Sequence, residues 1–377
     1  MKMSRQRANL EGSIYQRRSD GRWVAAISIG DGKRKTAVAP TQAAAKRRLE
    51  ELRDVADQGL SFGTDPTVAD YLRRWLKESA PRTLRPRTLA GYTSIVERGL
   101  IPRLGHLRLR KLHPSDIDGY LIRIEEIGLS ARTGQYHHAV LRRALGQAEK
   151  WGLVPRNVAK LVTPPQVRRR EVAPLTPDQA RQFLAGIEGD RLAALYGVSL
   201  SLGLRQGEAL GLQWAGVNFQ RGTLTVEHTL QRYGGAYHLD EPKTERSRRT
   251  INLPSSVAES LRHHRIQQAE GRVALGPAWV GAKWDLVFCN EVGEPLDGTA
   301  VTRAFQKKLA ELGLPRQRFH DLRHAAGSFM LAQGASLREV MEVLGHSSIQ
   351  TTADIYLHIL PQLKKETADR MEALLYG

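Results

Sequence analysis

Cysteine and long apolar runs are scarce in this chain of 377 residues. A single cysteine, Cys289, excludes an internal disulfide framework and fits a reducing cytoplasm. No apolar run approaches the roughly 20 residues that a membrane span requires, and the polar, basic residues 1–10 lack the apolar segment of a secretory signal. We therefore expect a cytoplasmic protein without a membrane segment, in which Cys289 is a small buried side chain.

Positive charge is what the chain has in excess. Its 57 Lys and Arg against 39 Asp and Glu give a formal net charge of +18, and residues 1–165 contribute +15 of it, from 31 basic and 16 acidic side chains. Such an excess favours a polyanion, because released counterions drive the association. An anionic membrane surface is the rival partner, but no long helix sets a Trp/Phe/Leu face opposite a Lys/Arg face. The charge therefore favours nucleic acid, of a kind that charge alone does not specify.

Residues 12–58 predict a small sheet with one helix. Strands are expected at 13–18, 22–29 and 33–39, joined by turns at 19–21 and 31–32, and a helix capped by Thr41 runs to residue 58. The basic residues of this sheet either enter a DNA groove, as a strand ribbon can, or form a solvated edge that resists aggregation. They are Arg17, Arg22, Lys33, Arg34 and Lys35.

Residues 67–160 predict a helical segment that follows a linker at 59–66. Helical spacing of apolar residues indicates helices near 68–76, 88–99, 114–126 and 131–151. The high positive charge of this segment favours a surface that grips the DNA backbone over an ordinary solvated face. The arginines that we assign to that surface are Arg85, Arg87 and Arg142.

A second linker, at 164–170, precedes a change of pattern. Helices are expected from Thr176 and over 191–202, strands over 223–228 and 249–253, and mainly helices after His263. The predicted fold is therefore α+β and multidomain. It combines a small three-stranded sheet plus helix (1–62), a helical domain (63–166) and a mainly α domain with a small antiparallel sheet (167–377), with boundaries good to about 2–4 residues.

Two basic residues of the last segment stand near predicted element ends. Arg205, in GLRQGEALGLQW, opens a helix after another ends at Gly203, and Glu208 lies one turn away to orient it. Taken alone, this pair is as readily an exposed ion pair of little energetic value. Lys243 lies on the loop between the two strands, where a lysine is usually just solvated.

The segment HDLRHAAGSFML places His320 and Arg323 on one helix face. Arginine suits a phosphate because it donates two parallel hydrogen bonds. His320 and His324 also have the spacing of a metalloprotease helix, but that motif needs Glu in second place and an additional ligand. Asp321 stands there instead, and Arg323 would put a cation beside the metal, so we expect no metal.

In LGHSSIQTTADIY, Gly345 ends a helix, His346 occupies an exposed corner and Tyr356 follows in a new helix. A lone tyrosine in such a place is usually part of the core. Together, however, the three motifs match a known pattern in type, order and spacing. Over roughly residues 170–360 the chain resembles the catalytic domain of tyrosine recombinases of the phage and mobile-element integrase type, with no departure at a catalytic position.

The resemblance extends, with less specific motifs, to the other segments. The N-terminal sheet unit is similar to the arm-type DNA-binding domain of larger integrases, and residues 67–160 are similar to their core-binding domain. The family implies a site-specific recombinase that cleaves and rejoins DNA strands through a 3′-phosphotyrosyl intermediate. It would integrate and excise a phage or mobile element.

The resemblance also implies a role for each residue of the motifs. Tyr356 would be the nucleophile, and Arg205 and Arg323 would hold the non-bridging oxygens of the phosphate. His320 and His346 would add hydrogen bonds to that phosphate and help to steer the tyrosine proton.

The resemblance implies roles for two further residues, and it also implies partners. Lys243 would protonate the departing 5′ oxygen, and Glu208 would hold Arg205 in place. The covalent link stores the bond energy, so neither ATP nor any other cofactor is expected. The implied partners are double-stranded DNA attachment sites, a homotetramer on two duplexes, a directionality factor and a host DNA-bending protein.

Three other functions stay open on the residues alone. A DNA-binding regulator would explain the charge, but not the ordered series of motifs, and would tolerate Tyr356→Phe. A metallohydrolase using His320 and His324 would lose its activity in EDTA. A type IB topoisomerase shares the chemistry but does not exchange strands, and the separate arm-like domain argues against it.

Overall fold

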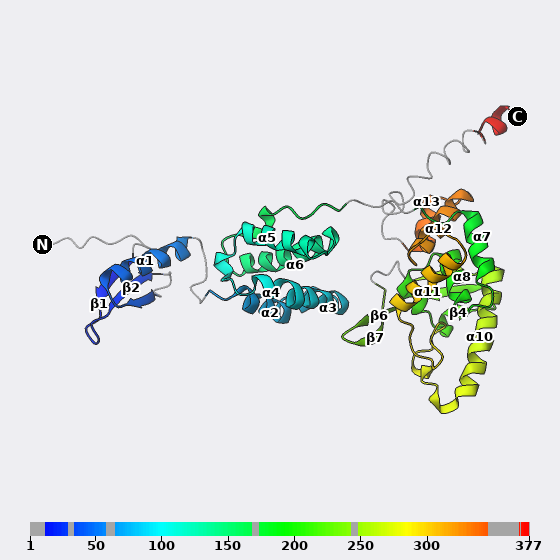
Figure 1. Cartoon of the computed structure of the whole chain (residues 1–377), viewed down its shortest axis with the longest axis horizontal. Helices are drawn as coiled ribbons and strands as arrows, with labels where there is room; N and C mark the ends of the chain where they lie inside the picture. Colours follow the sequence, from blue (N-terminus) through cyan, green and yellow to red (C-terminus); the bar gives the residue numbers. More distant parts are fainter. Residues whose placement is uncertain are drawn as a thin grey trace. The chain divides into compact units, whose positions relative to one another are not determined.

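The computed structural model describes residues 12–28, 34–57, 65–167, 173–242, 248–345, 369 and 371–376. Contacts divide the chain into two compact units, Met1–Arg169 and Arg170–Gly377. Figure 1 labels the main elements of each unit. Within the described residues no helix has both the length and the apolar character to cross a membrane.

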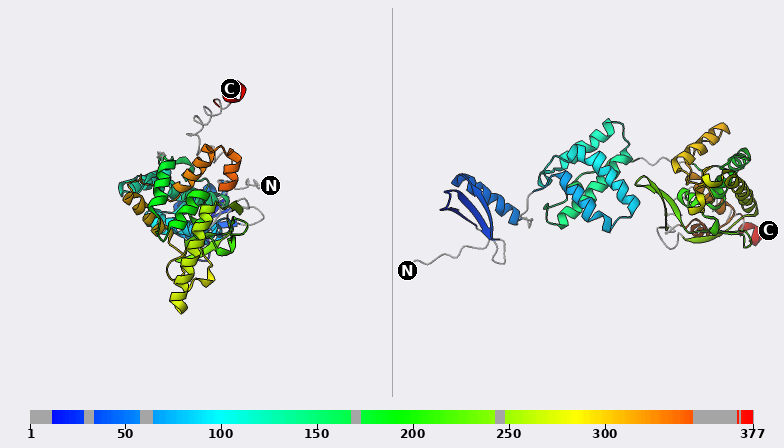
Figure 2. Two further views of the ribbon diagram at one scale, coloured as in Figure 1. Left: turned by 90° about the vertical axis from the view of Figure 1, so that its right-hand side faces the viewer. Right: turned by 90° about the horizontal axis from the view of Figure 1, so that it is seen from below.

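The first unit begins with the predicted sheet and helix. Strands β1 (Ser13–Gln16), β2 (Trp23–Ser28) and β3 (Arg34–Ala39) form an antiparallel sheet with β2 in the centre. Helix α1 (Gln42–Asp57) lies along the sheet (Figure 2) and closes a small core of Ala25, Ile27 and Leu49. Arg17 and Arg22 lie in the β1–β2 connection and not on the strands, because the turn closes there through the Arg17–Asp20 ion pair.

The helical part of the first unit surrounds a larger apolar core that contains Tyr71, Trp75 and Leu141. Residue 88 was expected to begin the second helix, but α3 begins at Pro86, since proline is tolerated in the first turn. The helix continues through the π-helical turn of residues 96–100 and on to residue 104, so it extends past the predicted end at residue 99. The elements are α2 (Val68–Glu78), η1 (Ala80–Arg82), α3 (Pro86–Ile95), η2 (Val96–Leu100), α4 (Ile101–Leu104), η3 (Leu109–Lys111), α5 (Pro114–Glu126), α6 (Ala131–Lys150) and η4 (Val158–Leu161).

Part of the predicted second linker packs on this helical part. The Gln135 side chain donates to the carbonyl of Pro165 at 2.9 Å. A Cβ on Gly134 would lie 3.1 Å from the Pro165 ring, so the glycine leaves room for the proline to sit against α6. Pro165, within the predicted linker, is therefore packed against α6, and residues 168–170 lie outside the described residues.

The second unit is mainly helical and carries two small antiparallel sheets. The buried helix α8 lies at its centre, and most of its side chains belong to one large core with those of α7, α10, α11 and α12. The predicted strands correspond to β5 and β8, whereas the hairpin β6–β7 was not predicted. The elements are α7 (Pro177–Gly186), α8 (Ala193–Leu202), α9 (Gln206–Leu210), η5 (Trp214–Gly216), β4 (Val217–Asn218), β5 (Thr223–Val226), β6 (Thr229–Tyr233), β7 (Ala236–Asp240), β8 (Arg249–Asn252), α10 (Ser255–Leu275), η7 (Gly276–Ala278), η8 (Gly281–Lys283), α11 (Gly298–Glu311), α12 (Asp321–Ala332) and α13 (Leu337–Leu344).

The predicted fold class is confirmed. The first unit combines a three-stranded sheet and a helix with a helical part, and the second unit is mainly α. Its sheets have the orders β4-β5-β8 and β6-β7. Strand β8 contacts both β5 and α13, which brings segments from the middle and the end of the unit together.

Candidate active site

Arg205 stands at the turn between α8 and α9. Helix α8 ends at Gly203 in the left-handed conformation, with φ +64°, and Arg205 is the N-terminal cap of α9. Its backbone N–H donates to Glu208 Oε2 at 3.0 Å, Nη1 donates to Glu208 Oε1 at 2.6 Å, and Nη2 donates to the Gly345 carbonyl at 2.9 Å. The Arg205 side chain nevertheless stays 37% exposed. It is thus anchored at two points and still reaches the surface.

Arg323 lies on α12 and is only 1% exposed. Its Nη1 donates to the carbonyl of Gly203 at 2.8 Å. That carbonyl ends α8, where helix carbonyls carry partial negative charge and attract a cation. The bond places Arg323 beside the turn that carries Arg205, two residues further along the chain.

The two arginines are therefore held in the same way. Each donates to the carbonyl of a glycine that ends a helix: Arg323 to Gly203 after α8, and Arg205 to Gly345 after α13. Gly345 is also left-handed, with φ +65°. A Cβ on Gly203 would collide with Leu344, so the ends of α8 and α13 pack closely. Because the ends of α8 and α13 meet, the guanidinium groups of Arg205 and Arg323 are held in the same part of the second unit.

His320 is the residue that precedes α12. The buried carboxylate of Asp321 accepts a hydrogen bond from the Arg318 backbone N–H at 2.7 Å and pairs with the Arg318 guanidinium, which fixes the turn that carries His320. Part of the His320 residue is exposed, but burial of the ring among protein atoms lowers its pKa, and His324 and Arg323 lower it further, to about 4. The imidazole is therefore neutral near pH 7, with one nitrogen able to donate and the other able to accept.

Arg249 was missed in the sequence. It starts β8, and its side chain is 7% exposed. Its Nη2 lies 3.0 Å from Glu208 Oε2, and its Nε donates to the carbonyl of Val343 at 2.6 Å. Strand alternation was the available signal, because Arg249 shares a strand face with the buried Ile251, and an arginine facing the core must have a partner.

Glu208 joins Arg205 and Arg249. Burial alone would raise its pKa, but the charges of Arg249 and then Arg205 outweigh burial and lower the pKa below its usual value. The carboxylate is thus charged near pH 7. It holds both guanidinium groups, one on each oxygen.

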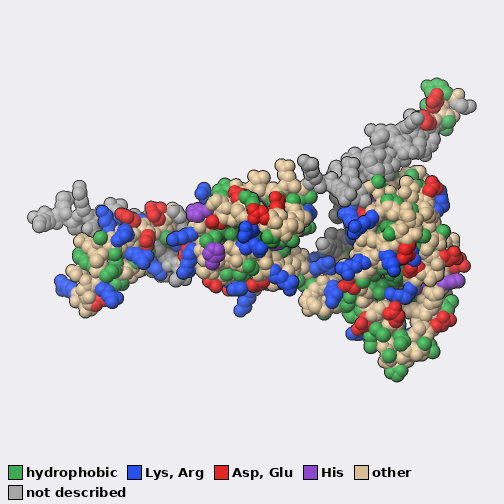
Figure 3. Space-filling view, in the orientation of Figure 1, with side chains coloured by type: hydrophobic (Ala, Val, Ile, Leu, Met, Phe, Trp, Pro, Cys, Tyr) green, Lys and Arg blue, Asp and Glu red, His purple; other side chains and the backbone are tan. Residues whose placement is uncertain are grey.

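Several predicted site residues lie outside the described residues. They are Lys33, Lys243, His346 and Tyr356. The predicted DNA-contacting residues that the structure describes are all exposed: Arg17, Arg22, Arg34, Lys35, Arg85, Arg87 and Arg142. Figure 3 shows many Lys and Arg side chains on the surface of the first unit.

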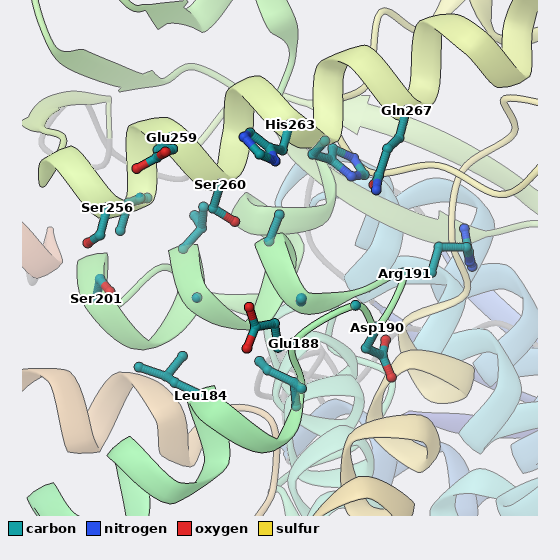
Figure 4. A pocket seen from close by; sticks show the side chains of 18 residues that line it. Leu184, Glu188, Asp190, Arg191, Ser201, Ser256, Glu259, Ser260, His263 and Gln267 are labelled. Atoms are coloured by element: carbon teal, nitrogen blue, oxygen red, sulfur yellow. The ribbon is translucent and has the colours of Figure 1, made fainter.

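A separate hollow of about 480 Å³ lies between α8 and α10 in the second unit. Figure 4 shows its lining, with Ser256, Ser260 and His263 along α10 on one side and Ser201 opposite Ser256. None of the predicted catalytic residues lines it. The predicted catalytic residues that the structure describes, Arg205, His320 and Arg323, therefore lie outside this hollow.

Comparison with known proteins gives consistent matches along the chain. A family model described as the phage integrase family matches residues 174–362, and one described as the phage integrase N-terminal SAM-like domain matches residues 67–122. An integrase of Streptomyces ambofaciens is 32% identical over 94% of both chains.

Solved structures share the fold. The Tn1549 transposon integrase in complex with a circular intermediate DNA has a TM-score of 0.68 at 21% identity, covering 81% of this chain and 99% of that one. A lambda integrase tetramer bound to a Holliday junction has a TM-score of 0.58 at 18% identity, covering 93% and 96%. The fold is thus common to integrases from a transposon and a phage.

Proposed function

Because the chain belongs to the phage integrase family of tyrosine recombinases, we propose that Arg205, His320 and Arg323 act with Lys243, His346 and Tyr356 on one DNA phosphate. The chain is a site-specific recombinase that cleaves and rejoins DNA strands through a 3′-phosphotyrosyl intermediate. It integrates and excises a phage or mobile element. The assignment of each residue below is our proposal.

The observation that carries the assignment is the pair of arginines held by helix-end glycines. A phosphodiester repels a nucleophile because its non-bridging oxygens are negative. Arg205 and Arg323 neutralise that charge most effectively in the transition state, where it is greatest, and their fixed bonds to Gly345 and Gly203 mean that little reorganisation is needed. Removing one such donor lowers a rate by about 10²–10³-fold.

Strand cleavage then proceeds by displacement at phosphorus. The Tyr356 oxygen attacks the phosphorus, the bond from phosphorus to the 5′ oxygen breaks, and Lys243 gives that oxygen a proton. His320 and His346 hydrogen-bond the phosphate and accept or steer the tyrosine proton. Because the pKa of His320 is lowered to about 4 in the DNA-free chain, its ring is neutral beforehand, and a bound phosphate would raise that pKa. The free 5′ hydroxyl of a partner strand later reverses the attack.

The other parts of the chain bind and position DNA. We assign residues 1–62 to an arm-type DNA-binding domain, 63–166 to a core-binding domain and 167–377 to the catalytic domain. The match of residues 67–122 to the integrase N-terminal domain supports the second assignment. By analogy with the lambda integrase tetramer on a Holliday junction, four protomers would act on two attachment sites. A directionality factor and a host DNA-bending protein would assist them.

The test of this function is covalent trapping. The full chain is incubated with a nicked duplex that carries the element's own crossover core, taken from the junction between element and chromosome. We expect a protein–DNA product on a denaturing gel that forms in EDTA and is absent for Tyr356→Phe. A product formed by Tyr356→Phe, or no product from folded wild-type chain on that core, would contradict the assignment.

A further inference from the structure

Arg249 joins three segments of the proposed site. It begins β8, the strand that follows the segment with Lys243. Its guanidinium binds Glu208, the partner of Arg205, and it also binds the carbonyl of Val343 at the end of α13, shortly before His346. One side chain therefore connects the neighbourhoods of three groups assigned to catalysis.

The contacts of Arg249 indicate what kind of role it can have. Its Nη2 lies 3.0 Å from Glu208 Oε2, and its Nε donates to the Val343 carbonyl at 2.6 Å. Its side chain is 7% exposed, whereas that of Arg205 is 37% exposed. These contacts suit a residue that acts on the reaction through other groups of the chain.

Close packing ties Arg249 to the turn after α13. A Cβ placed on Gly345 would lie 2.9 Å from Arg249 Nη1 and 3.2 Å from its Cδ. The guanidinium thus lies against the same glycine whose carbonyl accepts from Arg205. Arg205 and Arg249 together hold two carbonyls at the end of α13, those of Gly345 and Val343.

We infer that Arg249 is a positioning residue for strand cleavage, which sets Arg205 and the end of α13 in their working places through Glu208 and Val343. This inference rests on the proposed function. Without Arg249, the buried carboxylate of Glu208 keeps Arg205 as its described cationic partner and draws that side chain inward. The Val343 carbonyl at the end of α13 also loses a donor, and displacements of about 1 Å at a reacting group can lower a rate about 10²-fold.

The experiment is a double-mutant cycle on the full chain with Arg249→Met, Glu208→Gln and the double variant. Each protein is mixed in excess with the nicked core duplex, and the rate constant and final amplitude of covalent product are recorded, with DNA affinity measured by fluorescence anisotropy. A merely structural loss reduces the amplitude, since fewer chains are folded, but leaves the rate constant of folded chains unchanged. A positioning loss reduces the rate constant itself.

We expect Arg249→Met to lower the cleavage rate constant about 10²-fold, while DNA affinity changes by less than about threefold because no phosphate contact is lost. Since part of the effect of Arg249 passes through Glu208, the loss of rate in the double variant should be smaller than the product of the two single losses. The matched control is Arg181→Met on α7, which removes an exposed arginine from an ion pair with Asp178 and should cleave at the wild-type rate.

A wild-type rate constant for Arg249→Met, or losses that multiply in the double variant, would overturn the inference. If Arg249→Met alone does not fold, the double variant, which removes the charge and its partner together, is compared with Glu208→Gln. A further loss clearly smaller than about 10²-fold supports the inference, and a further loss of the full 10²-fold or so overturns it. A wild-type chain without a Tyr356-dependent product would instead contradict the proposed function.

Discussion

The arginines of the first unit and those around Arg205 differ in how much of each side chain water can reach. Arg85, Arg87 and Arg142 are exposed on the helical part of the first unit. In the second unit Arg249 and Arg323 are almost fully buried, and Arg205 is anchored by a carboxylate and a carbonyl. The two groups of arginines thus carry the same charge but differ in burial and in the partners that hold them.

The energetic reason follows from the surroundings. Exposed arginines interact with DNA through a screened field to which many charges contribute, so each one matters little. A buried arginine remains charged only if partners compensate for its lost water. Helix-end carbonyls and Glu208 supply that compensation here, and they also fix direction. We therefore expect the exposed arginines to govern affinity for DNA, and the anchored arginines Arg205, Arg249 and Arg323 to govern the geometry of the proposed site.

The largest expected effect is at Arg323. Arg323→Lys keeps the charge but replaces a planar fork by a single ammonium group, which cannot bind both Gly203 and a phosphate in the same way. We expect the cleavage rate constant to fall about 10²–10³-fold, with DNA affinity nearly unchanged. Single-turnover cleavage rates and DNA affinities from fluorescence anisotropy check this. A cleavage rate near that of the wild type would remove the distinction between the exposed arginines and the anchored ones.

The next effect is at the glycine that holds Arg323. Gly203→Ala forces an L side chain into the left-handed region, which costs roughly 1–2 kcal/mol, and its Cβ would collide with Leu344. We expect a larger loss of unfolding free energy than in Gly313→Ala, which has φ +67° and open space around it, together with slower cleavage. Denaturant melts of both variants decide the matter, since equal losses would mean that the close approach at Gly203 is unimportant.

A smaller effect is expected in the first unit. Arg87→Ala should weaken binding of the core duplex at every sequence and, if one phosphate contact is lost, reduce the slope of log affinity against log salt by about 0.9. Cleavage at saturating DNA should not change. Arg123→Ala is the control, because that arginine already pairs with Glu126. Slower cleavage by Arg87→Ala at saturating DNA would instead mean that Arg87 affects the geometry of the reaction, as the anchored arginines are expected to do.

The smallest effect concerns His320 and pH. Its folded pKa of about 4 lies below the value near 6.5 of an unfolded chain. As pH falls below 6.5, the unfolded chain binds a proton that the folded chain does not, so His320 lowers the free energy of unfolding towards pH 4 and has no effect above 6.5. Wild type should therefore lose more thermal stability between pH 7 and pH 5 than His320→Gln. Equal losses would contradict the shifted pKa.

Local signals explain what the sequence predicted well. Pro114 fixed the start of α5, and Gly203 and Gly345 were expected to end helices, as they do in α8 and α13. These predictions depend on the conformational limits of single residues. The contact between Arg205 and Glu208 could be expected because the residues lie one turn apart.

Tertiary contacts explain what the sequence did not predict. The hairpin β6–β7 is stabilised by Leu230 in the main core and by the stack of Tyr233 on His238, with ring centres 3.9 Å apart. The partners of Arg249 are distant in sequence, so no local pattern names them. The places of Lys243, His346 and Tyr356 in the site stay predictions.

The most direct test of the central claim removes the charge that the arginines are proposed to neutralise. Arg205→Met and wild type are compared on a nicked core duplex with an ordinary scissile phosphate, and on one with a methyl group in place of a non-bridging oxygen. We predict that the deficit of the variant, about 10²-fold or more on the phosphate, shrinks to less than about tenfold on the uncharged linkage, because little negative charge is left to neutralise. An equal deficit on both substrates would contradict the claim that Arg205 acts on the phosphate charge.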